Sequence, residues 1–204
     1  SFQPYELVRK REGMRPLRPT SLPSLPGERL PSWIENRREA PLLHMTLGTN
    51  IGTNGDISMF RSVIDGLSSL DVDVLITMGF EGDRASLGPL PGNVYVEHYM
   101  PHSLLLPRCS AVICHGGLGT TLSSLALGLP LLILPQGADQ YVVGDLVRAS
   151  GAGLCLTPPH ANASTNRQSV LALLDESGYR ANPRPLPPDT PACSRPEQRS
   201  QLTR

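Results

Sequence analysis

Six short runs of apolar residues alternate with longer segments of mixed polarity along the middle of the chain. The apolar runs have the length of buried strands and cover residues 42–47, 72–78, 94–96, 111–114, 131–134 and 154–156. Apolar positions recur at helical spacing between several of these runs, which predicts helices over 57–70, 120–127, 140–149 and 166–176. Strands that alternate with helices form a parallel sheet with right-handed crossovers. The pattern therefore predicts an α/β fold, with a single Rossmann-like domain over residues 41–180.

The two ends of the chain differ in composition from this middle part. Residues 1–40 are rich in proline and arginine, which is typical of a linker that leads into a domain. Residues 181–204 contain six prolines from Pro183 to Pro196, and such spacing forbids a regular helix. We expect this second segment to be a disordered tail.

Composition limits the classes of function. The 204 residues contain 18 basic and 18 acidic side chains, so no basic surface for nucleic acid is expected. No apolar run has the length of a membrane span, and no signal peptide is visible at the start. The spacing of the four cysteines fits neither a disulfide framework nor a zinc site. We therefore expect a reduced, cytoplasmic protein without a metal ion.

A glycine-rich turn follows the strand predicted at 111–114. It reads His115, Gly116, Gly117, Leu118, Gly119, Thr120. Glycines let a bulky anion approach the backbone, and the start of the following helix attracts phosphate. His115 and Thr120 can add hydrogen bonds to a diphosphate. The alternative is an ordinary tight turn with a packed histidine, since the turn matches neither the dinucleotide fingerprint nor the P-loop.

Asp139 and Gln140 follow the next predicted strand and begin a helix. An acid beside an amide can bind several sugar hydroxyls, whereas the alternative role for Asp139 is a simple helix N-cap. If the strand order is 3-2-1-4-5-6, the first and fourth strands are neighbours at the topological switch point. The loop that contains Gly48 and Thr49 would then face the His115 turn across one crevice.

The segment from Cys114 to Gln140, CHGGLGTTLSSLALGLPLLILPQGADQ, resembles the nucleotide-sugar signature of GT-B glycosyltransferases. The likeness covers about residues 15–182 and is closest to the enzymes that glycosylate macrolides and other natural products, with UDP-glycosyltransferases more distant. It implies the C-terminal, donor-binding half of such an enzyme. His102, Cys114 and Leu118 depart from the residues usual in that family.

The resemblance also implies a role for each site residue. The strand-end loop with Gly48 and Thr49 would border the donor. The nucleoside base would lie on Tyr99, Met100 and Pro101. The diphosphate would lie on His115, Gly116, Gly117, Gly119 and Thr120, and the sugar on Asp139 and Gln140.

The implied activity is transfer of a hexose from UDP or TDP to a small aglycone in antibiotic-type biosynthesis, without a metal or cofactor. No catalytic base is assigned, because in the family it belongs to an N-terminal acceptor-binding domain, which here would be missing or on a partner chain. The alternatives are a non-catalytic or degenerate nucleotide-sugar-binding fragment and a sugar-nucleotide epimerase. The choice between UDP and TDP, the sugar, the acceptor and the oligomeric state stay open. The proline-rich tail stands where the family has a long helix, so we hypothesise a change of reading frame there.

Overall fold

The computed structural model describes residues 24–48, 57–80, 82–175 and 179. In this part of the chain, six parallel strands form one sheet in the order β3-β2-β1-β4-β5-β6. The strands are β1 (Leu42–Thr46), β2 (Asp73–Thr77), β3 (Val94–Glu97), β4 (Ala111–Cys114), β5 (Leu131–Ile133) and β6 (Gly153–Cys155). The predicted α/β class and the Rossmann strand order are both confirmed.

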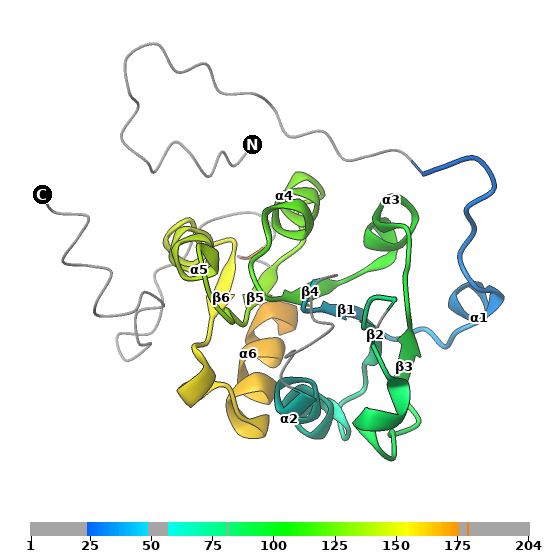
Figure 1. Cartoon of the computed structure of the whole chain (residues 1–204), viewed down its shortest axis with the longest axis horizontal. Helices are drawn as coiled ribbons and strands as arrows, with labels where there is room; N and C mark the ends of the chain where they lie inside the picture. Colours follow the sequence, from blue (N-terminus) through cyan, green and yellow to red (C-terminus); the bar gives the residue numbers. More distant parts are fainter. Residues whose placement is uncertain (1–23, 49–56, 81, 176–178, 180–204) are drawn as a thin grey trace, which may run out of the picture.

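Helices cover both faces of the sheet (Figure 1). Helices α2 and α6 lie on one face, and α3, α4 and α5 lie on the other. The helices are α1 (Ser32–Glu35), α2 (Ile57–Leu67), α3 (His102–Leu105), α4 (Leu118–Ala126), α5 (Gln140–Ala149) and α6 (Ala163–Asp175), with 3₁₀ turns at η2 (Arg84–Leu87), η3 (Leu106–Arg108) and η4 (Pro158–His160). None of the helices in the described residues is long and apolar enough to cross a membrane.

The central strands are buried along their whole length, which explains why they are mostly apolar in the sequence, with His44, Thr46, Asp73 and Thr77 as buried polar exceptions. Successive side chains of a strand point to opposite faces of the sheet. In β1, Leu43 and Met45 enter the core under α2 and α6, while Leu42 enters the core under α3, α4 and α5. The sheet therefore separates two hydrophobic cores, and its carboxyl edge is left to loops.

Helix α4 begins two residues earlier than predicted, at Leu118 instead of Thr120, with Gly117 as its N-cap. Helical spacing predicts Leu122, Leu125 and Ala126 on the buried face of this helix. In the structure Leu125 is partly buried against the core, but Ala126 is exposed, and the fully buried side chains are Thr121 and Ser124. Ser124 Oγ donates to the Thr120 carbonyl at 2.8 Å, so its hydroxyl is satisfied within the helix. Small hydroxyl residues let the helix lie close to the sheet, and an apolar pattern does not reveal them.

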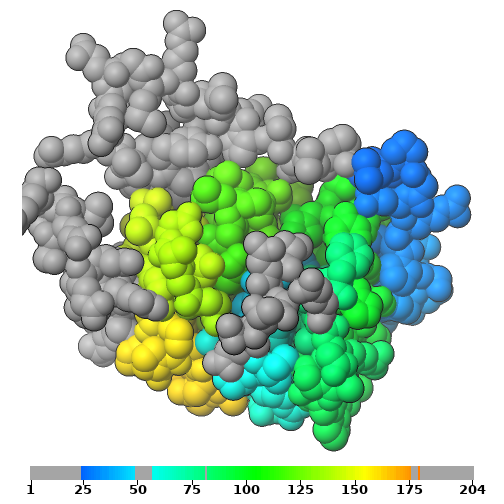
Figure 2. Space-filling model, in the orientation of Figure 1, coloured from blue at the N-terminus to red at the C-terminus, as the bar shows by residue number. Residues whose placement is uncertain are grey.

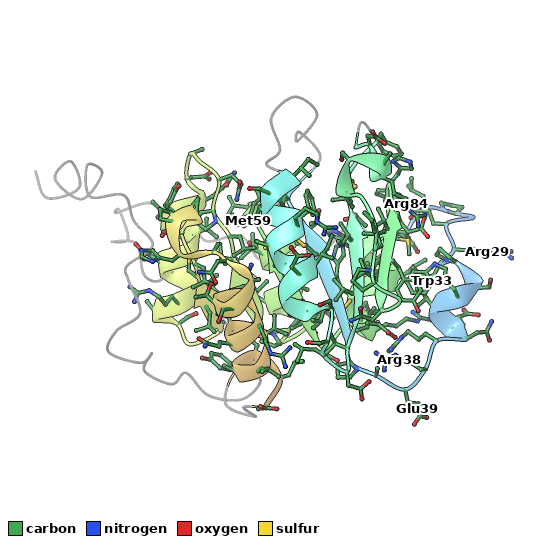
Figure 3. All side chains as sticks on the ribbon, turned by 90° about the horizontal axis from the view of Figure 1, so that it is seen from below. Arg29, Trp33, Arg38, Glu39, Met59 and Arg84 are labelled. Carbon is green, nitrogen blue, oxygen red and sulfur yellow. The ribbon has the colours of Figure 1, made fainter. Side chains whose placement is uncertain are left out.

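Residues 24–40, which we call the leading segment, pack along the β3 side of the sheet (Figure 2). Trp33 of α1 stacks on Tyr95 of β3 with ring centroids 4.1 Å apart, and its Nε1 donates to the Glu97 carboxylate at 3.2 Å. Figure 3 shows Trp33 between α1 and the strands, with Arg38 further along the segment. Arg38 Nε donates to the fully buried Asp73 carboxylate at 2.9 Å. The segment is thus fastened at two points, although the predicted domain boundary at residue 40 stays a prediction. The predicted tail at 181–204 lies outside the described residues.

Helices α2 and α6 approach closely at Gly66, and this contact gives a test of the fold. A Cβ at Gly66 would lie 2.4 Å from the Ala163 carbonyl oxygen, which is backbone and cannot move aside cheaply. We expect Gly66→Ala to lower the free energy of unfolding by about 1–3 kcal/mol, as overpacking does, although alanine normally favours a helix. The matched control is Gly119→Ala in α4, where a Cβ would meet nothing within 4 Å. Urea unfolding measures both, and equal stability of the two variants would contradict the packing.

Candidate functional site

Strands β1 and β4 lie side by side, with Thr46 paired to Cys114 at their carboxyl ends. The chain order reverses between them, so this is the topological switch point of the sheet, where ligands of α/β proteins bind. The loop after Thr46 and the turn after Cys114 therefore emerge at the same edge. This confirms the predicted juxtaposition for Gly48, while Thr49 lies outside the described residues.

The His115 ring is packed between two glycines. Gly48 has a φ of 96°, and a Cβ there would lie 3.0 Å from His115 Cε1. A Cβ at Gly117 would lie 2.5 Å from His115 Nε2, closer than real Cβ contacts come. The left-handed φ at Gly48 favours glycine, and at Gly117 a side chain would have to displace the imidazole. The imidazole thus joins the loop after β1 to the N-cap of α4.

Burial lowers the pKa of His115 below its ordinary value, against the opposing effects of the nearby Thr46 carbonyl and the Asp139 carboxylate. The neutral ring is thus favoured near pH 7. Its Nδ1 is buried and makes no hydrogen bond with the described part of the chain.

The first turn of α4 presents unpaired backbone N–H groups beside this histidine. Thr121 is the first residue of the helix whose N–H bonds back, to the Gly117 carbonyl at 3.0 Å. The preceding N–H groups have no acceptor within a helix. Gly119 is exposed and has no neighbour within 4 Å of a Cβ position, so an anion can approach the backbone there.

Asp139 and Gln140 adjoin the His115 turn from the next strand end. Gly116 has a φ of 93°, and a Cβ there would lie 3.1 Å from the Gln140 carbonyl oxygen. Asp139 occupies the N-cap position of α5 but makes no capping hydrogen bond, and it is exposed. Gln140 Oε1 accepts from the backbone N–H groups of Gln136 and Gly137 at 2.7 and 3.1 Å. Gln140 therefore orders the loop after β5. Its side-chain oxygen is used in this way, so it would bind a ligand by donating from its amide N–H groups.

A cleft of about 850 Å³ opens at the carboxyl edge of β1 and β2. Helix α4, the segment from His98 to Pro107 and part of the leading segment form its walls. Six of the predicted site residues line it: Gly48, Tyr99, Met100, Pro101, Gly119 and Thr120. His115, Gly116, Gly117, Asp139 and Gln140 do not line it, but His115 touches the cleft residue Gly48.

The predicted base-binding segment enters the cleft in three different ways. Tyr99 is 51% exposed and stacks on Phe80, with ring centroids 5.8 Å apart. Met100 is 3% exposed and its side chain belongs to the hydrophobic core, so the backbone is its main contact with the cleft. Pro101 is buried and precedes the first residue of α3.

Several cleft residues were missed by the sequence analysis. Thr77 could have been predicted, because it is the last residue of β2 and ligands bind at the carboxyl ends of parallel strands. Phe80 lies in the loop after β2. Leu25 and Glu28 come from the leading segment, whose composition gave no sign that it reaches a site. No lysine or arginine lines the cleft in the described residues.

A buried histidine lies beneath the cleft. His44 of β1 is fully buried, and its Nε2 lies 3.0 Å from Thr77 Oγ1. Its ring meets His102 edge-on at 5.2 Å. Burial first, and then His102, lower the pKa of His44 to about 3. His44 therefore stays neutral in the folded protein.

The comparison with known families agrees with this geometry. The family profile described as the C-terminal domain of erythromycin biosynthesis protein CIII-like proteins matches residues 61–200. Because the match covers more than half of the chain, the chain belongs to this family. Among the similar curated proteins is tylactone mycaminosyltransferase of Streptomyces fradiae, which is 32% identical over 153 residues. That alignment covers 74% of this chain but 34% of the relative, so the chain spans about a third of the length of that protein.

Solved structures give the same result. The glycosyltransferase SnogD from Streptomyces nogalater superposes with a TM-score of 0.70 at 31% identity, over 84% of this chain and 45% of SnogD. The spinosyn rhamnosyltransferase SpnG, complexed with thymidine diphosphate, superposes with a TM-score of 0.66 at 30% identity, over 74% of this chain and 41% of SpnG. The predicted resemblance to the C-terminal half of GT-B glycosyltransferases is therefore confirmed.

The low pKa of His44 predicts acid sensitivity of the fold. The unfolded chain binds a proton on this histidine below about pH 6.5, whereas the folded chain does so only near pH 3. Stability is therefore lost as pH falls through this window, by about 2 kcal/mol between pH 7 and pH 5. We expect urea unfolding of the His44→Leu variant to lack this loss, while the exposed control His160→Ala keeps it. The same pH slope in His44→Leu as in the native chain would contradict the assignment.

Proposed function

We propose that the cleft binds a pyrimidine nucleoside diphosphate sugar, and that the chain is the donor-binding part of a glycosyltransferase. The observation that carries this proposal is the contact of His115 with Gly48 and Gly117, beside the exposed first turn of α4. It gathers backbone N–H groups and a polar ring at one strand edge. The relatives support it, since they are glycosyltransferases of natural products and SpnG is complexed with thymidine diphosphate.

The diphosphate lies, in this proposal, against the first turn of α4. The described residues that line the cleft supply no lysine or arginine, so the negative charge is met by helix N–H groups, the Thr120 hydroxyl and His115. These neutral donors need no metal ion to bridge them, and we propose that binding survives removal of divalent cations. The loop with Gly48 and Thr49 borders the same group, with Gly116 holding the turn against α5.

The two ends of the donor extend in opposite directions from the diphosphate. The nucleoside base lies toward Tyr99, Met100 and Pro101, where an exposed ring can stack on it. The sugar lies toward Asp139 and Gln140, whose carboxylate and amide N–H groups bind hydroxyls. Asp139 is suited to this role because its carboxylate makes no capping bond in α5.

The reaction joins an oxygen of the acceptor to the anomeric carbon of the sugar, while the bond to the diphosphate breaks. The α4 turn stabilises the charge that develops on the departing diphosphate. The acceptor hydroxyl must give its proton to a base, for which we assign no residue of this chain. We propose that an acceptor-binding domain or partner chain supplies it, in keeping with a chain that spans 34% of its relative.

This function is proposed for biosynthesis of a small-molecule natural product, and a cytoplasmic location stays a prediction. An epimerase or a degenerate binding fragment is not favoured, because the similar curated proteins are transferases or synthases of natural-product glycosides. The choice between uridine and thymidine nucleotides is left to measurement.

Two substitutions distinguish the binding of the diphosphate from the binding of the sugar. Thr120→Ala removes a donor beside the diphosphate, so it should weaken UDP and UDP-glucose alike, by about threefold to tenfold. Asp139→Ala removes a charged acceptor for hydroxyls, so it should weaken UDP-glucose by about tenfold or more and leave UDP nearly unchanged. Titration calorimetry with UDP, TDP and their glucose conjugates, with and without a chelator, measures these effects.

The control for Asp139→Ala is Asp175→Ala, an exposed aspartate at the end of α6. It should bind every nucleotide as the native chain does. Equal loss of UDP and UDP-glucose in the Asp139 variant would refute the sugar role. Failure of the folded native chain to bind any pyrimidine nucleoside diphosphate would refute the proposed function itself.

A further inference from the structure

A turn of the leading segment closes one wall of the cleft. The Glu28 N–H donates to the Leu25 carbonyl at 3.1 Å, and the Leu25 N–H donates to Glu28 Oε2 at 2.7 Å. Gly27 between them has a φ of 90°, which glycine adopts readily. One oxygen of the Glu28 carboxylate, Oε2, is therefore fixed by a hydrogen bond within this turn.

The second carboxylate oxygen reaches the aromatic residue assigned to the nucleoside base. The Tyr99 hydroxyl donates to Glu28 Oε1 at 3.0 Å, across 71 positions of the sequence. Phe80, which also lines the cleft, stacks on Tyr99 with their planes 16° apart. Partial burial first, and then the hydrogen bond to Glu28, raise the pKa of the Tyr99 phenol.

Tyr99 needs such support because it is poorly packed. Half of its surface is exposed, and Phe80 is itself 77% exposed. An exposed ring of this kind loses rotational freedom when a ligand stacks on it, and that loss reduces affinity. A ring already fixed at its hydroxyl end has less freedom to lose.

We propose that Glu28 is a positioning residue that fixes the Tyr99 ring for stacking on the base of the donor. The inference rests on the proposed function, because it takes the ligand at Tyr99 to be a nucleoside. It assigns part of the donor site to a segment that precedes the sheet in sequence. Glu28 acts through Tyr99 in this scheme and does not itself contact the nucleotide.

A double-mutant cycle tests this scheme. Calorimetry with UDP and TDP compares the native 204-residue chain with Glu28→Ala, Tyr99→Phe and the double variant. Both single variants break the same hydrogen bond, so each should weaken binding by about twofold to tenfold, and the double variant should be no weaker than either. Glu28→Gln keeps an oxygen acceptor and should restore most of the affinity. The control Glu39→Ala removes an exposed carboxylate outside the cleft and should bind as the native chain does.

Three results would overturn the inference. The first is native affinity in Glu28→Ala. The second is additive losses in the double variant, because they would mean that Glu28 contacts the nucleotide directly. The third is Glu28→Gln as weak as Glu28→Ala, because then the charge and not the hydrogen bond would matter.

A second readout needs no nucleotide, so failure of this inference can be told from failure of the proposed function. In chains labelled at the tyrosine ζ carbon, the Tyr99 phenol of Glu28→Ala should titrate at lower pH than in the native chain or in Glu39→Ala. An unchanged Tyr99 titration in Glu28→Ala would overturn the inference even if nucleotides bind. Absence of nucleotide binding to the native chain, with the titration shifted as expected, would refute the nucleoside role and leave the Glu28 contact standing.

Discussion

The packing of the His115 ring against Gly48 and Gly117 is the contact on which the geometry of the site depends. One glycine follows β1 and the other caps α4, so the ring fixes the start of the helix relative to the neighbouring strand end. The parallel pairing of β1 with β4 makes this contact possible, since it brings both loops to one edge. A Cβ at Gly117 would overlap the imidazole, and one at Gly48 would crowd it at 3.0 Å. The site is therefore built by close backbone approach more than by charged side chains.

The strands and most helices could be predicted because their burial leaves a regular trace in the sequence. Strands covered on both faces are mostly apolar, as in β4, and α2 carries a regular apolar stripe. The start of α4 could not be found in this way, because its inner face is made of Thr121 and Ser124. Short helices such as α1 and α3 could not be predicted either, because four residues are too few to show the helical spacing of apolar positions.

The candidate site was predictable in its backbone and less so in its side chains. Glycines between a strand and a helix indicate a turn that an anion can approach, and the structure brings that turn next to Gly48. The hydrogen-bond partners of the side chains could not be predicted. The sequence shows that Gln140 can accept and donate, but not that its oxygen is taken by the amides of the preceding loop. The sequence likewise does not reveal the contact between Glu28 and Tyr99. Their hydrogen bond joins residues 71 positions apart, and no local pattern encodes such a contact.

The leading segment has a further consequence, for association between copies of the chain. β3 is the outermost strand on its side of the sheet, and an uncovered outer strand offers unpaired backbone groups to other chains. Trp33 stacks on the side chain of Tyr95 in that strand, and Ile34 of α1 is buried in the core on the same face. A domain trimmed to begin at residue 41 would expose the Tyr95 ring and the apolar surface under Ile34 next to this outer strand. Poor solubility of such a fragment would then report exposed apolar surface and not an unstable sheet.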